Sequence, residues 1–124
     1  MSSEKRSRRE QLEDRLIDFA IEVNNILDKL PNTYLGNNLA SQLTRSSTSP
    51  ALNYGEAQGG ESTKDFIHKM KISLKELRET YVGLKIIERG RLIKDVSDIN
   101  LMKREANELI SIFVASINTA SKRL

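Results

Sequence analysis

Apolar residues recur at spacings of three and four along four separate segments, and this periodicity restricts the chain to an all-helical fold. Such spacing places one apolar stripe on one face of a helix and is typical of near-parallel helix packing. Aromatic residues make up only 5% of the chain. A β-sandwich is therefore disfavoured, and the core is expected to be aliphatic. The most regular stripe comprises Ile99, Met102, Ala106, Leu109, Ile110, Phe113, Ile117, Ala120 and Leu124.

Short breaks separate these segments. Pro31 ends the first helix, Gly59-Gly60 closes the second, and Gly90 begins the last turn. Links this short make consecutive helices antiparallel neighbours. We predict an all-α, up-down-up-down antiparallel four-helix bundle over residues 10–124. The helices are expected over about residues 10–30, 36–57, 62–89 and 96–122, after a flexible basic N-terminal arm over residues 1–9.

Side chains able to cap two of the helices stand at the expected starts. Ser62 or Thr63 can cap the third helix. For the fourth helix the candidates are Asp95, Ser97 and Asp98.

A small, polar stretch from Arg45 to Ala57 interrupts the apolar pattern of the second helix. Small residues let helices approach closely, and their hydroxyls can bond back to carbonyls four residues earlier. Pro50 is expected to kink the helix. A tight contact with the third helix is favoured over a catalytic serine, because the one histidine, His68, has no matched partner.

Basic residues gather on one exposed face of the third helix, within a chain whose net charge is +3. No aromatic residue interleaves with them, so base stacking has little support. A solvated face and a face that binds a phosphate backbone or an acidic partner both remain open. The six candidate nucleic-acid-binding residues are Lys64, Lys71, Lys75, Arg78, Lys85 and Arg89, with His68 on the same face and Asp65, Glu76 and Glu79 on the other flank.

A second apolar row on the same helix suggests self-association. Ile72 and Ile86 lie fourteen residues apart, outside the main core stripe and beside the acidic flank. A monomeric bundle needs only one apolar stripe per helix. These two residues are the predicted oligomer face.

Several classes of function are disfavoured by what the chain lacks. Without cysteine there are no disulfides or thiolate metal sites. A di-metal carboxylate bundle would need Glu-x-x-His pairs, whereas Asp65 stands three residues before His68. No catalytic set or nucleotide fingerprint occurs, so no enzyme, cofactor or metal is expected. The charged N-terminus and the absence of any apolar run near ~18 residues predict a cytoplasmic protein with no membrane partner.

The polar stretch and the third helix resemble a known family, the bacterial 23S rRNA intervening sequence proteins. The similarity covers residues from about 15 to 120, and the usual pattern reads Arg-Ser-Ala-x-Ser-Ile-x-x-Asn-Ile-Ala-Glu-Gly. This chain departs from that pattern at Pro50, Tyr54, Gly55 and Ala57. The matching residues are Arg45-Ser46-Ser47-Thr48-Ser49, Asn53, Glu56, Gly59, Glu61, Asp65-Phe66, Lys69-Met70, Ile72, Leu74-Lys75-Glu76-Leu77 and Glu79-Thr80.

The resemblance implies an up-down bundle that assembles into a ring, commonly a homopentamer, with RNA binding and no catalysis. It also implies a relation to the accessory variability determinant of diversity-generating retroelements, a basic pentameric barrel that binds nucleic acid and a reverse transcriptase. Arg45, Asn53 and Glu56 belong to the family motif. We interpret them as a polar network that holds the second helix to the third.

Three functions compete at this point. The first is an oligomeric module that binds RNA or DNA through the basic face, assisted by the N-terminal arm. The second is a scaffold that binds a protein partner and no nucleic acid. The third, a bundle that binds a small molecule in its core, is least favoured because the core is filled by ordinary aliphatic residues.

Overall fold

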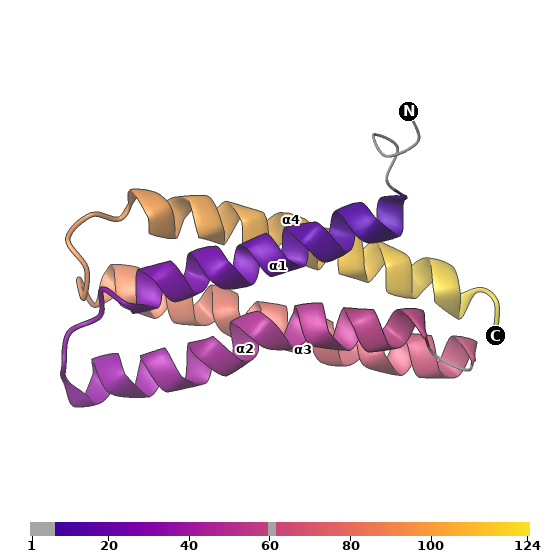
Figure 1. The fold of residues 1–124 in the computed structure, drawn as a ribbon, viewed down its shortest axis with the longest axis horizontal. Coiled ribbons are helices and arrows are strands. Elements are labelled where there is room, and N and C mark those ends of the chain that lie inside the picture. Colours follow the sequence, from indigo (N-terminus) through magenta and orange to yellow (C-terminus); the bar gives the residue numbers. More distant parts are fainter. Residues whose placement is uncertain (1–6, 60–61) are drawn as a thin grey trace.

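A computed structural model describes residues 7–59 and 62–124 and shows a four-helix bundle (Figure 1). Within these residues each helix contacts the next, and α1 contacts α4, so the helices surround one core in cyclic order. The predicted up-down-up-down bundle is confirmed, and the described residues contain no strand. The helices are α1 (Arg8–Leu27), α2 (Tyr34–Gln58), α3 (Thr63–Arg89) and α4 (Ser97–Ser121).

Two faces of the bundle lie opposite one another. The α1–α4 face lies at the top of Figure 1 and the α2–α3 face lies at the bottom. In this view α1 and α4 cross, and they share the least extensive contact of the four neighbouring pairs. These two faces are therefore separated by the thickness of the core.

The core is aliphatic with two buried phenylalanines, Phe19 and Phe113. Most of the apolar stripe predicted for the last helix is buried in the core, since six of its residues are buried along α4. Leu124 is an exception, because α4 ends at Ser121 and leaves it exposed. The most completely buried side chains also include Leu16, Leu43, Met70, Leu77, Leu84, Ile87, Ile99 and Leu109.

The first helix begins earlier than predicted. Ser7 caps it by accepting a hydrogen bond from the Glu10 amide, and the Glu10 carboxylate accepts one from the Ser7 amide. This capping box satisfies two amides that have no partner inside the helix. Arg8 and Arg9 are therefore helical and do not belong to a flexible arm, while the rest of the predicted arm, residues 1–6, lies outside the described residues.

The link between α1 and α2 also differs from the prediction. Helix α1 ends at Leu27, before a short turn that precedes Pro31. Helix α2 starts at Tyr34 because Thr33 caps it by accepting a hydrogen bond from the Gly36 amide at 3.0 Å. The helix therefore begins two residues before the predicted start at residue 36.

The starts of α3 and α4 are capped in different ways. Ser62 accepts a hydrogen bond from the Asp65 amide, as predicted for the third helix. The cap position of α4 is Val96, which makes no side-chain cap bond. Instead the Asp95 carboxylate, one residue earlier, accepts hydrogen bonds from the amide of Ser97 at 3.0 Å and from its hydroxyl at 2.8 Å.

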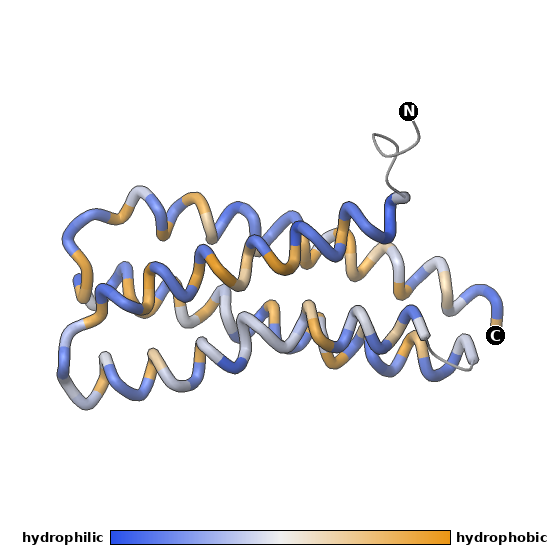
Figure 2. The backbone as a smooth tube through the Cα atoms, in the orientation of Figure 1, coloured by the Kyte–Doolittle hydropathy of each residue, from blue (hydrophilic) through white to orange (hydrophobic). Residues whose placement is uncertain are grey.

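Helix α2 carries the small polar stretch through the middle of the bundle. It changes direction about halfway along in Figure 1, and Pro50 lies within it without an amide to donate. Figure 2 shows the same part of α2 as a pale, near-neutral stretch between more strongly coloured helices. Small side chains are thus packed where the other helices present large apolar ones.

Candidate nucleic-acid interface

The six residues predicted to bind nucleic acid form a basic stripe along the outer face of α3. Lys64, Lys71, Lys75, Arg78 and Arg89 are exposed, and Lys85 is half-buried. Within residues 7–59 and 62–124 none of the six makes an ion pair. Their charge is therefore not neutralised by the bundle itself.

Lysines next to the stripe behave differently. Lys69 binds Glu56 at 2.7 Å, and Lys103 of α4 binds Glu88 at 2.7 Å. Both of these pairs join α3 to a neighbouring helix, whereas no cation of the stripe makes such a pair within the described residues. The position on the helix thus separates structural cations from free ones.

Tyr81 of α3 lies beneath one lysine of the basic stripe. The Lys85 ammonium is 5.3 Å from the centre of the Tyr81 ring, a distance typical of a cation–π contact. The two residues are four apart, so they share one helix face. Tyr81 therefore adjoins the stripe, and Lys85 lies over its ring.

The acidic flank of α3 is bound by one arginine from α2. Arg45 contacts Glu76 and Glu79 at 2.7 Å each, and these hydrogen bonds, first to Glu79 and then to Glu76, raise the pKa of Arg45. Glu56 reaches α3 separately, through Lys69. Asn53 instead donates to the carbonyl and hydroxyl of Ser49 in its own helix.

The three motif residues therefore do not meet in one network within the described part of the chain. Arg45 and Glu56 each hold α2 to α3 through a different partner, and Asn53 stabilises the polar stretch of α2 internally. The separation follows from their spacing, because Arg45 and Glu56 are eleven residues apart and lie about three helical turns from one another.

Buried hydroxyls connect α2 and α3 beside these ion pairs. Ser46 and Thr80 lie 2.8 Å apart and are completely buried. Thr80 also donates to the Glu76 carbonyl, so its single proton is used there and Ser46 is the donor to Thr80. Gly83 lies one turn further along α3, in contact with Leu43. The hydroxyls stabilise a close helix contact, and none lies beside a histidine.

A polar residue that the periodicity did not single out joins α1 to α2. Asn24 donates to the Ala20 carbonyl and to the Ser47 hydroxyl, at 2.7 Å and 3.0 Å, and accepts from Thr44 at 3.0 Å. Its position between Val23 and Ile26, at the edge of the apolar stripe, was the available signal. Asn24 thus forms a polar network that holds α1 to α2, whereas the motif was expected to form such a network between α2 and α3.

An apolar groove of about 410 Å³ lies between α2 and α3. Ile86, one of the two predicted oligomer residues, lines it and is 40% exposed, whereas Ile72 is half-buried and does not line it. Val82, which lies between them in sequence, also lines the groove and is 52% exposed. It was not predicted as part of the oligomer face because it lies among basic residues on the helix surface. Lys75 and Arg78 of the basic stripe also line this groove.

A groove of about 310 Å³ on the opposite face, between α1 and α4, has the opposite charge. Its carboxylates include Asp18 and Glu22 of α1 and Glu108 of α4, and Arg104 is the one cation among the described residues that line it. Leu101 is 50% exposed at its edge. The bundle thus presents an apolar groove with cations on one face and an apolar groove with carboxylates on the other.

Comparison with known proteins identifies the family. A family model described as 23S rRNA-intervening sequence protein matches residues 10–115. The chain belongs to this family. A crystal structure from Bacteroides thetaiotaomicron, described as a protein with unknown function from the S23 ribosomal protein family, is 26% identical with a TM-score of 0.78. That match covers 90% of this chain and 99% of the other, while no curated protein matches.

Neither the family description nor this neighbour indicates a catalytic role. In this 23S rRNA-intervening sequence protein, the described residues contain no group of three His, Asp or Glu side chains that could hold a metal ion. No helix of the described chain is both long and apolar enough to cross a membrane. His68 is exposed on the basic face, as predicted.

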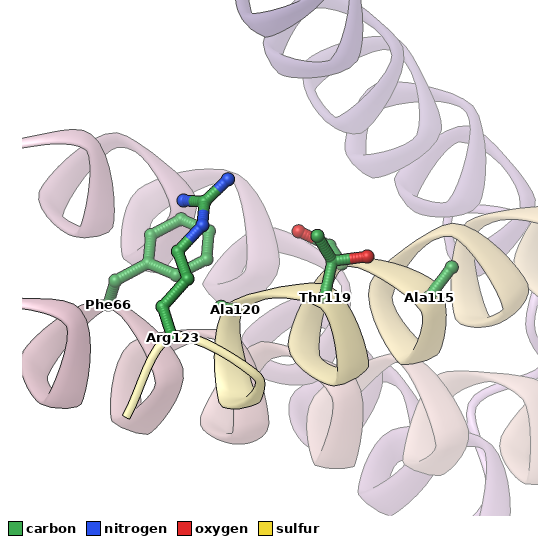
Figure 3. Close-up of a pocket in the computed structure, with 6 residues that line it drawn as sticks. Phe66, Ala115, Thr119, Ala120 and Arg123 are labelled. Atoms are coloured by element: carbon green, nitrogen blue, oxygen red, sulfur yellow. The ribbon is translucent and has the colours of Figure 1, made fainter.

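The far end of the bundle holds a shallow pocket of about 300 Å³ between the start of α3 and the end of α4 (Figure 3). In this family member, Phe66 and Arg123 lie next to one another, and Thr119 and Ala115 follow along α4. A ring, small side chains and one cation supply no acid–base pair. This pocket therefore adds no catalytic chemistry to the bundle.

Proposed function

We propose that this chain is a non-enzymatic, oligomeric module of the cytoplasm that binds RNA or other nucleic acid through the basic stripe of α3. The observation that supports this most is the absence of ion pairs on all six cations within the described residues. Cations without carboxylate partners can neutralise phosphates without first breaking a salt bridge. Binding of this kind releases counterions and weakens steeply as salt rises.

The test is a titration of labelled single-stranded RNA at several salt concentrations. Each phosphate contact contributes about −0.7 to the slope of log K against log salt for single strands. Lys64→Gln together with Lys71→Gln should make the slope shallower by about 1.4. Both side chains are exposed and lie outside the α2–α3 groove.

The matched control replaces two cations that are exposed away from the stripe. Lys94→Gln with Lys122→Gln removes the same charge from the chain. It should leave the slope unchanged. Equal slopes for the two double variants, or no binding even at low salt, would refute a role for the stripe.

The two oppositely charged grooves support self-association. The α2–α3 groove offers Val82 and Ile86 with two cations, and the α1–α4 groove offers Leu101 with several carboxylates. A second copy of this chain is therefore a complementary occupant in both apolar surface and charge. Because the two grooves lie on opposite faces, the contact is heterologous, and repeating it gives a ring if the rotation closes. The resemblance adds the prediction of a homopentamer and of the relation to the accessory variability determinant.

Charge reversal tests this contact. Lys75→Glu with Arg78→Glu should dissociate the assembly, as should Asp18→Lys with Glu22→Lys. All four substitutions in one chain should restore it, because the attraction is then inverted rather than lost. Light scattering coupled to size exclusion measures the mass, and circular dichroism checks that each variant stays helical. A monomeric wild-type protein, or an assembly whose mass is unchanged by the charge reversals, would overturn this part of the proposal.

The same grooves favour one alternative, a scaffold that binds another protein. A wild-type assembly that shows no RNA affinity at physiological salt would select this alternative. The grooves would then be examined for a partner that is not a second copy.

A further inference from the structure

A cleft of about 310 Å³ lies between the beginning of α1, the end of α2 and the second half of α4, and no residue of α3 lines it. It is therefore separate from the basic stripe. Its lining combines cations and one amide with apolar side chains: Arg8, Arg9, Arg15 and Gln11 with Leu12, Tyr54 and Ile112. Cationic groups beside a small apolar surface are the usual composition of a site for an organic anion.

Tyr54 forms the inner wall of this cleft. Only 6% of the residue is exposed, and its ring packs against Phe113 with 6.0 Å between ring centres. Its hydroxyl makes no hydrogen bond within the described residues, yet no completely buried side-chain oxygen there lacks a partner. The hydroxyl is therefore not completely buried, and Tyr54 lines the cleft. Burial raises the pKa of Tyr54, so this group is a neutral donor at physiological pH.

The three arginines differ in their availability. Arg15 donates to both carboxylate oxygens of Glu105, at 3.0 Å and 2.6 Å, and lies 3.5 Å from Glu108, which fixes it as part of the wall. Arg8 and Arg9 make no ion pair within the described chain. The charges of Arg9 and Glu13 both act on Tyr54, in opposite directions, but Glu13 does not line the cleft.

We infer that this cleft binds a phosphate monoester attached to a flat apolar group, in practice a nucleoside monophosphate, free or at the 5′ end of an RNA strand. Arg8 and Arg9 bind the phosphate oxygens, for which the guanidinium fork is suited. The Tyr54 hydroxyl, which makes no hydrogen bond within the described residues, donates one to a phosphate oxygen. Leu12 and Ile112 contact the base. This site shares no lining residue with the basic stripe or with the two grooves of the proposed assembly.

The experiment titrates adenosine monophosphate into the full-length protein and follows backbone amides by NMR. Signals of residues 8–15, 54 and 112 should shift in a saturable way. Tyr54→Phe keeps the ring and removes only the donor, and Arg9→Gln removes one free cation. Each should weaken binding about tenfold, because each removes a hydrogen bond to a charged group. Lys94→Gln, which changes an exposed cation outside the cleft, should bind as the wild type does.

Further ligands separate the sources of the phosphate. A 5′-phosphorylated trinucleotide that binds more tightly than adenosine monophosphate would identify the strand end, and weaker binding would identify the free nucleotide. The 5′-hydroxyl trinucleotide should shift none of these signals. Inorganic phosphate should bind more weakly than the nucleotide, and equal affinity would refute the role of the apolar wall.

Two results would overturn the inference: no saturable binding of any 5′-phosphate, or unchanged affinity in both Tyr54→Phe and Arg9→Gln. Arg9 is exposed at the start of α1, so its variant tests the site even if Tyr54→Phe alters packing. Lys64→Gln with Lys71→Gln should leave nucleotide affinity unchanged. Failure of the cleft and failure of the stripe are thereby distinguishable.

Discussion

Replacing Gly83 with alanine tests the closest approach between α2 and α3. A Cβ at this position would overlap Cδ2 of Leu43 and lie 2.6 Å from its Cδ1 and 2.9 Å from its Cγ. Leu43 is 1% exposed and surrounded by core, so its side chain has little room to move away. Ser46 and Thr80 hold the same pair of helices together one turn away. The added methyl must therefore strain the contact or separate the helices.

The expected effect follows from two opposing terms. Alanine is favoured over glycine inside a helix by about 1 kcal/mol. Overpacking a well-filled core typically costs about 1–3 kcal/mol, and three close contacts with Leu43 place Gly83→Ala near the upper end. The net loss should be about 1–2 kcal/mol, which for a chain of this size lowers Tm by roughly 5 °C.

Thermal unfolding followed by circular dichroism at one protein concentration measures this loss. Gly55→Ala is the matched control, because a Cβ there meets nothing within 4 Å and also lies inside a helix. That variant should gain about 0.5–1 kcal/mol. If Gly83→Ala stabilised the protein as much as Gly55→Ala does, the close approach of α2 and α3 would be refuted. Leu43→Ala should also be less harmful in the Gly83→Ala background than in the wild type, since each change relieves the other.

Three further predictions concern polar groups. Ser46→Ala and Thr80→Val should each lower the free energy of unfolding by more than half of what the double variant loses, because removing one hydroxyl disturbs its buried partner. A double-mutant cycle of unfolding free energies measures this coupling. Hydrogen bonds from Ser97 lower the pKa of Asp95 below 3.8, so its contribution to stability should be present above that pH and vanish as pH falls through the lowered pKa; Asp95→Asn should abolish this dependence in acid unfolding curves. Burial raises the pKa of Tyr54 above 10.0, so its contribution should be present below pH 10.0 and lost as pH rises through the raised pKa; Tyr54→Phe should remove that alkaline loss.

The bundle could be predicted from the sequence because each helix carries its own periodic stripe and the links are short. Helix ends were less accurate, since they depend on single side chains. The start of α1 was readable, because Ser7 and Glu10 have the spacing of a capping box. The cap of Thr33 on Gly36 was also local, but the change from polar to apolar residues near Leu35 obscured it.

The candidate sites were less predictable, because they depend on how helices lie against each other. The exposed positions of the basic stripe follow from one helix alone. By contrast, the ion pairs of Arg45 join residues 31 and 34 positions apart and require the register between α2 and α3. The nucleotide cleft combines α1, α2 and α4, so nothing in the local sequence around Tyr54 marks it.

The overlap between the basic stripe and the α2–α3 groove determines how the stripe can be used. Val82 and Ile86 line this groove together with Lys75 and Arg78. Covering apolar side chains with another apolar surface lowers the free energy. A nucleic-acid backbone is strongly hydrated and offers no such surface. In the proposed assembly, a second copy would cover these apolar residues and, through Asp18 and Glu22, would also pair with the two cations. The remaining four cations, Lys64, Lys71, Lys85 and Arg89, do not line the groove and stay free for phosphates. Assembly is therefore expected to use two of the six cations of the stripe and nucleic-acid binding the other four, so each can be removed without the other.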